Sequence, residues 1–201
     1  MDTFDAIYQR RSVKAYDPQH EMSDAEVTKL MEAAVQSPTS FNMQNWRFVL
    51  IKENKELRAK LREASYNQAQ VEEASLVIIL AADLNAHADN PARYWKDAPE
   101  ETSKMMSGML AGFYEGKDQL QRDEAQRSCA IAGQTIMLAA KAMGYDTCPM
   151  IGFDIEKVGQ LINLPENHLI SFMITVGKQV KAAWPKPGQL ELSEVVIRDQ
   201  F

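Results

Sequence analysis

Two of the residue types that most often carry a small protein's chemistry are scarce in this chain of 201 residues. Its only cysteines, Cys129 and Cys148, cannot build the disulfide framework of a small secreted protein. His20, His87 and His168 lie far from one another and from any cysteine, so no metal-binding motif is present. These absences favour a reducing compartment, and we expect a cytoplasmic protein without a metal.

Long apolar runs and an excess of positive charge are also lacking. No stretch reaches the ~18 apolar residues of a membrane span, and the first residues lack the apolar core of a signal peptide. The 22 Lys and Arg residues against 28 Asp and Glu give a net charge of −6, which disfavours a nucleic-acid binder with a positive face. We therefore expect no membrane or nucleic-acid partner, and any bound anion needs a local cluster of cations.

The common catalytic motifs are missing as well. The sequence contains no HExxH, GxSxG, Walker or GxGxxG motif. An enzyme without such motifs can take its chemistry from a bound cofactor, and then the protein supplies binding and orientation.

The apolar pattern predicts one domain, residues 1–201, with helices around a single mixed sheet. Helices are expected over residues 3–10 and 123–143. Another helix is expected to begin at the capping box of Ser23 and Glu26 and to end before Pro38. Strands are expected over 46–51, 76–82, 147–151 and 169–176. Gly108, Gly112 and Gly116 share one helix stripe, which favours close helix packing over a flexible lid. The C-terminal arm (residues 178–201) has little to bury against itself, so we expect it to pack on a partner chain.

Four segments carry signals of a binding site. The basic segment (residues 10–14, RRSVK) either binds phosphate or complements the dipole of the preceding helix. The polar loop (residues 38–44, PTSFNMQ) offers hydroxyl and amide groups or is a plain connection. The amide segment (residues 66–70, YNQAQ) could contact a heteroaromatic edge or cap a helix. The glycine turn (residues 149–152, PMIG) could press its backbone against a flat ring.

In this order and spacing, the four segments resemble those of the nitroreductase family of FMN-dependent reductases that use NAD(P)H. The resemblance covers essentially the whole chain and rests on RRSVKAYD, SPTSFNMQNWRF, YNQAQVEEASLVII, GYDTCPMIGFD and VGKQVKAAWPKPGQLELSEVV. It implies an α+β fold with a largely antiparallel central sheet flanked by helices. It also implies an intertwined homodimer with FMN in two clefts at the interface.

The resemblance further implies a role for individual residues. The phosphate and pyrimidine side of the flavin would be held by Arg10, Ser12 and Lys14, with Arg11 contributing mostly its backbone. The other chain would supply Pro38, Thr39, Ser40 and Asn42, with Gln44 nearby. The polar edge of the flavin would face Asn67 and Gln70. The ring near N5 would pack against Pro149, Met150, Ile151 and Gly152.

Two positions depart from the family pattern. Many relatives present an arginine to the phosphate near the C-terminus, whereas this chain offers Lys186 in the comparable stretch. Relatives often carry a carboxylate where this chain has Ile151, so hydrogen bonds to the flavin at this turn must come from main-chain N–H groups.

The implied activity is a ping-pong cycle in which NADH or NADPH gives a hydride to flavin N5, and a nitroaromatic, quinone or similar small-molecule acceptor takes it. Phe41, Phe113 and Tyr114 are either walls of the acceptor pocket or ordinary core packing. The alternatives are a family member specialised for enone reduction or dehalogenation, a flavin-binding or regulatory protein without turnover, and a structural helical dimer.

Overall fold

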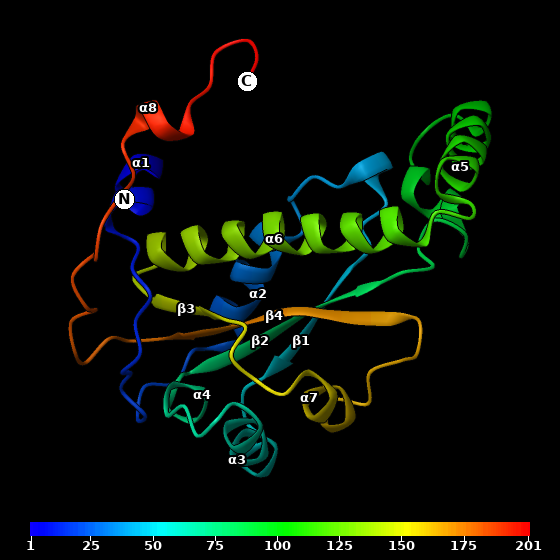
Figure 1. Cartoon of the computed structure of the whole chain (residues 1–201). Helices are drawn as coiled ribbons and strands as arrows, with labels where there is room; N and C mark the ends of the chain where they lie inside the picture. The colour runs from blue at the N-terminus through cyan, green and yellow to red at the C-terminus, as the bar shows by residue number, and fades with distance from the viewer.

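A four-stranded sheet runs through the middle of the computed structural model, which describes residues 1–201 (Figure 1). The strand order is β1 (Trp46–Ile51), β2 (Leu76–Asp83), β4 (His168–Gly177) and β3 (Asp146–Met150). Every neighbouring pair of strands is antiparallel. The parallel component is limited to one isolated bridge between Ser12 and Thr147. The prediction of a largely antiparallel sheet in an α+β fold is confirmed, with its mixed character reduced to that bridge.

The apolar character of the strands decides their position in the sheet. All eight residues of β2 are buried, as expected for a continuous apolar run that is covered on both faces. Pro149 lies in β3, an edge strand, where a residue that cannot donate a backbone hydrogen bond is tolerated. The edge beside Pro149 is therefore the side of the sheet that other segments can approach.

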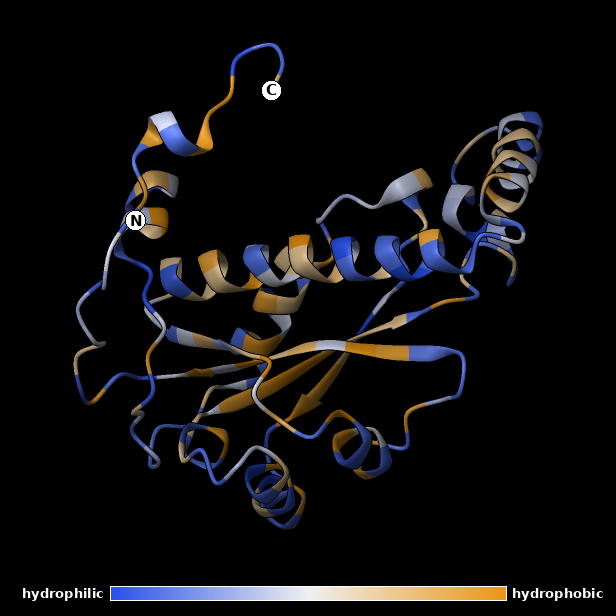
Figure 2. Ribbon diagram, viewed as in Figure 1, coloured by the Kyte–Doolittle hydropathy of each residue, from blue (hydrophilic) through white to orange (hydrophobic).

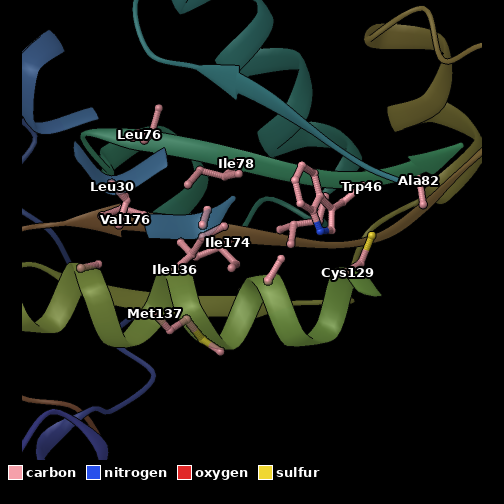
Figure 3. Packing of buried hydrophobic residues seen from close by; sticks show 14 of the residues in the cluster. Leu30, Trp46, Leu76, Ile78, Ala82, Cys129, Ile136, Met137, Ile174 and Val176 are labelled. Carbon is pink, nitrogen blue, oxygen red and sulfur yellow. The ribbon is translucent and has the colours of Figure 1, made fainter. Parts of the chain in front are cut away.

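Helices cover both faces of the sheet. The long helix α6 (Asp118–Ala142) and α2 (Asp24–Ala34) lie on one face, and α3 (Lys55–Ala64), α4 (Gln70–Glu73) and α7 (Ile155–Leu161) lie on the other (Figure 1). On the first face, Leu30 of α2 and Ile136 of α6 belong to the same apolar cluster as Ile174 of β4 (Figure 3). The ribbon coloured by hydropathy shows apolar residues concentrated in the strands and polar residues on the outer surfaces (Figure 2). No helix of the structure has the length and apolar character to cross a membrane.

Three helices and two 3₁₀ turns lie outside these layers. They are α1 (Thr3–Gln9), α5 (Glu100–Tyr114), α8 (Leu192–Val195), η1 (Ser40–Asn42) and η2 (Pro91–Trp95). Helix α5 stands away from the sheet beyond one end of α6 (Figure 1). A methyl group added at Gly108, Gly112 or Gly116 would meet no atom within 4 Å, so the close helix packing predicted for this stripe is not formed within the chain.

The first part of the C-terminal arm contacts its own chain, where the Val180 N–H donates to the Ala15 carbonyl and the Trp184 carbonyl accepts from Arg11. From Trp184 to Phe201 every residue is exposed, and the arm projects away from the sheet (Figure 1). Its apolar side chains include Trp184, 80% exposed, and Leu192, 76% exposed. On α1, Phe4 and Tyr8 are similarly exposed. Exposed apolar groups of this kind mark a surface suited to association with another chain.

Candidate functional site

The basic segment is fixed along the edge of β3. The Val13 N–H donates to the carbonyl oxygen of Thr147 at 3.0 Å. Val13 and Tyr16 are buried, and the Tyr16 hydroxyl lies 3.0 Å from Oγ1 of Thr175. Because side chains alternate along extended backbone, burial of Val13 leaves Ser12 and Lys14 pointing outward.

A cleft of about 560 Å³ opens beside the basic segment. Four of the five residues of the basic segment line it, together with the first part of the C-terminal arm, including Lys181 and Lys186. None of the cleft's cations forms a salt bridge: Arg10, Arg11, Lys14, Lys181 and Lys186. Unpaired cations gathered in an acidic protein favour an anionic ligand.

Arg10 shows most directly that the cleft fits an anion. Its Nη1 is buried and has no hydrogen-bond partner within the chain. Buried polar groups are nearly always hydrogen-bonded, and an arginine fork matches the oxygens of a phosphate. The position of Arg10 therefore fits the phosphate group of FMN.

Arg11 has a different role from its neighbours, because its Nη2 donates to the main-chain carbonyl of Trp184. This bond holds the C-terminal arm against the basic segment, so the side chain, in addition to any backbone contribution, shapes the cleft. The sequence did not predict Lys181 as a cleft residue. Its position in the cleft depends on a bend in the C-terminal arm, and such a bend has no recognisable sequence pattern.

Burial makes the two thiols poor nucleophiles. Burial raises the pKa of the Cys129 thiol to about 12. Burial also raises the pKa of the Cys148 thiol, and the nearby cations Lys14 and Arg10 oppose that change. Because the thiolate is the reactive form, neither cysteine is suited to covalent catalysis.

The glycine turn directs its carbonyl groups inward. The Ile151 carbonyl accepts from the Phe153 N–H at 3.0 Å, and the Gly152 carbonyl accepts from Nε2 of Gln68 at 2.8 Å. The N–H groups of Ile151 and Gly152 donate no hydrogen bond within the chain. The turn thus presents free main-chain donors, as expected for a chain without a carboxylate at position 151.

The amide segment packs directly against this turn. Nε2 of Gln70 lies 2.9 Å from Oε1 of Gln68 and 3.7 Å from Sδ of Met150. Gln70 is buried, whereas Asn67 is exposed and has the left-handed φ of 59°. Gln70 therefore lies next to the glycine turn, through its contacts with Gln68 and Met150. Sequence reasoning missed Gln68, because three amides in five residues give no signal that separates their roles.

The polar loop has an unusual backbone that other elements hold in place. Phe41, Asn42 and Gln44 have φ values of 51°, 52° and 45°, a region that non-glycine residues rarely adopt. Nδ2 of Asn42 donates to the Tyr94 carbonyl at 2.9 Å, and the Gln44 N–H donates to Oγ1 of Thr39 at the same distance.

One chain does not bring the polar loop to the cleft of the basic segment. Asn42 and Gln44 line a different hollow, of about 500 Å³, and none of the loop's residues, from Pro38 and Thr39 to Gln44, lines the cleft. The polar loop and the basic segment of one chain thus lie in two separate hollows.

Phe41 of the polar loop packs against two aromatic residues, Phe113 and Tyr114. The ring centroids of Phe41 and Phe113 are 5.5 Å apart, and Phe113 is 45% exposed. Tyr114 is buried and its hydroxyl donates to Oγ of Ser40 at 2.8 Å, so it supports the loop from inside. Phe41 and Phe113 can contact a ligand, whereas Tyr114 serves as core packing.

Comparison with known proteins gives one consistent result. The family model described as "Nitroreductase family" matches residues 7–178. Protein DrgA of Synechocystis sp. is 54% identical over 201 residues, covering 98% of this chain and 95% of the relative. An NADH dehydrogenase of Thermus thermophilus is 30% identical, covering 98% and 96%. A nitroreductase-like protein of Exiguobacterium sibiricum, solved in complex with FMN, superimposes with a TM-score of 0.91 at 28% identity, covering 98% and 97%.

Proposed function

The chain belongs to the nitroreductase family, and on this premise we propose that it is an FMN-dependent oxidoreductase. Its electron donor is NADH or NADPH, and its acceptor is a nitroaromatic, a quinone or a similar small molecule. The observation that carries the proposal is the cleft lined by cations without ion pairs, among them Arg10, whose Nη1 is buried and has no hydrogen-bond partner.

The basic segment binds the phosphate end of the cofactor. Arg10 offers a guanidinium, Ser12 a hydroxyl and Lys14 an ammonium group on the same side of an extended backbone. Lys181 and Lys186 add charge from the C-terminal arm, in the region where many relatives have an arginine. Charge-assisted bonds of this kind are among the strongest hydrogen bonds in proteins.

The glycine turn and the amide segment bind the ring. FMN held there would supply the hydride transfer between the nicotinamide cofactor and the acceptor. The free N–H groups of Ile151 and Gly152 can donate to a ring nitrogen, and Asn67 of the amide segment offers an exposed amide. Since the two thiols are buried, the chain contributes binding and orientation rather than a nucleophile.

The site is completed by a second copy of the chain. The polar loop lies in a different hollow from the basic segment, and the C-terminal arm and α1 expose apolar side chains. We assign Pro38, Thr39, Ser40, Asn42 and Gln44 to the flavin bound mainly by the partner. Phe41 of that loop and Phe113 beside it form one wall of the acceptor pocket.

Charge reversal in the basic segment tests the proposal. Arg10→Glu and Lys14→Glu should each weaken FMN binding at least tenfold, because an anion that loses a charge-assisted bond and meets a negative charge loses more than about 1.4 kcal/mol. The measurement is quenching of flavin fluorescence when FMN is added to the apoprotein.

Two controls identify the phosphate as the group that is bound. Lys29→Glu changes an exposed cation on α2 and should leave FMN affinity unchanged. Riboflavin, which lacks the phosphate, should show a much smaller difference between wild type and the two basic-segment variants. A wild-type protein that fails to quench FMN, or variants that bind it as tightly as wild type, would contradict the assignment.

A further inference from the structure

We propose that Gln68 is a positioning residue of the flavin site. It acts through an amide relay, defined as the hydrogen-bonded chain from Gln70 through Gln68 to the carbonyl of Gly152. The relay fixes the glycine turn with its N–H groups free, and it leaves Gln70 only an oxygen atom to offer a ligand. This inference rests on the proposed FMN-dependent function.

The direction of the relay follows from its last member. A main-chain carbonyl can only accept, so the Gln68 atom 2.8 Å from the Gly152 oxygen must be the amide nitrogen, Nε2. That orientation turns Oε1 of Gln68 toward Gln70, whose Nε2 donates to it at 2.9 Å. The orientation of both side-chain amides is therefore set by the turn.

The relay restrains a turn that has few other internal bonds. The Gly152 carbonyl is bound by Gln68, and the Ile151 carbonyl is bound by the Phe153 N–H. A Cβ added to Gly152 would lie 3.3 Å from Nε2 of Gln68, so the side chain packs closely against this backbone. The Ile151 carbonyl and the Gly152 N–H point in opposite directions from one peptide plane, so the bond from Phe153 turns the Gly152 N–H away from that hydrogen bond. The bond from Gln68 fixes the next peptide plane, between Gly152 and Phe153.

The relay also decides what Gln70 can offer. Nε2 of Gln70 donates to Oε1 of Gln68 and contacts Sδ of Met150. Both hydrogens of this amide nitrogen are therefore directed at partners within the chain. Oε1 of Gln70 remains as the free polar atom of a side chain that is only 4% exposed. Gln70 is thus an acceptor suited to a ring N–H, beside a turn that supplies donors.

Two substitutions separate the halves of the relay. Gln68→Glu can still accept from Gln70 but cannot donate to the Gly152 carbonyl, whereas Gln68→Lys can donate to that carbonyl but cannot accept from Gln70. Gln68→Ala removes both bonds. Gln36→Glu, in the turn that follows α2, introduces the same change of charge at an exposed position and is the matched control for Gln68→Glu.

The measurements are made on the FMN-loaded protein. They are the dissociation constant of FMN, the visible circular dichroism of the bound flavin, and the rate of anaerobic flavin reduction by NADH. We expect Gln68→Glu and Gln68→Ala to alter the dichroism and to slow reduction about fivefold or more, the effect of losing one ordinary hydrogen bond. Gln68→Lys should retain the wild-type rate within about twofold, since the bond to Gly152 is kept.

The outcomes distinguish this inference from the proposed function. If wild type binds FMN and Gln68→Glu keeps the wild-type dichroism and rate, the relay has no positioning role. A Gln68→Lys variant as impaired as Gln68→Ala would equally overturn it, because the bond to Gly152 would then not carry the effect. A wild type that binds no FMN would instead reject the proposed function.

Discussion

Glu26 joins two distant parts of the molecule at the scale of a single residue. Its Oε2 accepts from the Ser23 hydroxyl at 2.7 Å and the Ser23 N–H at 2.9 Å, which completes the capping box of α2. Its Oε1 accepts from the Tyr145 hydroxyl at 2.9 Å, just beyond the end of α6. These bonds, those from Ser23 first, lower the pKa of the Glu26 carboxyl to about 2.

The lowered pKa of Glu26 should make the free energy of unfolding depend on pH in the acid range. Because its folded-state pKa lies below the ordinary 4.5, Glu26 stabilises the fold at neutral pH, and that contribution disappears as pH falls from about 4.5 to about 2. Glu26→Gln should therefore be less stable than wild type at pH 7, and the difference should shrink toward pH 2. Denaturant unfolding across this range measures it, with Glu32→Gln on the exposed side of α2 as control. An equal difference at both ends of the range would refute the assignment.

At the scale of elements, Gly177 allows Tyr16, two residues after the basic segment, to pack against the end of β4. A Cβ at this position would lie 2.8 Å from Cδ1 of Tyr16, whose buried ring is held by its hydroxyl contact with Thr175. Gly177→Ala should therefore lower the free energy of unfolding by about 1–3 kcal/mol, the usual cost of overpacking.

Helix α5 supplies the opposite case for comparison. Gly112 has open space around it, so Gly112→Ala should raise the free energy of unfolding by about 0.5–1 kcal/mol through helix propensity alone. Urea unfolding measures the free energy of unfolding of both variants, which should fall for Gly177→Ala and rise for Gly112→Ala. A neutral Gly177→Ala would show that Tyr16 can move, and the proposed anchoring of the basic segment would then be wrong.

The elements that could be predicted from sequence are those with strong local signals. The strand expected over 46–51 matches β1, and the capping box places the start of α2 correctly. Helix α6 begins at Asp118, earlier than the expected residue 123, because Lys117 provides no side-chain cap that would mark the start. The isolation of the polar loop from the basic segment and the relay through Gln68 depend on tertiary packing, which local patterns do not encode.

For the whole molecule, association of two chains should be linked to flavin binding. One chain separates the basic segment from the polar loop, and its C-terminal arm is exposed from Trp184 onward. Truncation after Gln189 should leave the fold of each chain intact, since the removed residues are all exposed, but should weaken the dimer and FMN binding together.

Analytical ultracentrifugation and FMN titration at several protein concentrations measure that link. In wild type, the apparent affinity for FMN should fall as dilution separates the chains, and the truncated chain should show the fall at higher concentration. An FMN affinity that does not change on dissociation would contradict a site shared between two chains.

The absorption spectrum of the purified protein before and after anaerobic addition of NADH or NADPH tests the central claim most directly. The account predicts a flavin spectrum that bleaches on addition of the nicotinamide cofactor and returns when a quinone or nitroaromatic acceptor is added. A protein that remains colourless in the presence of FMN, or a bound flavin that neither cofactor bleaches, would contradict it.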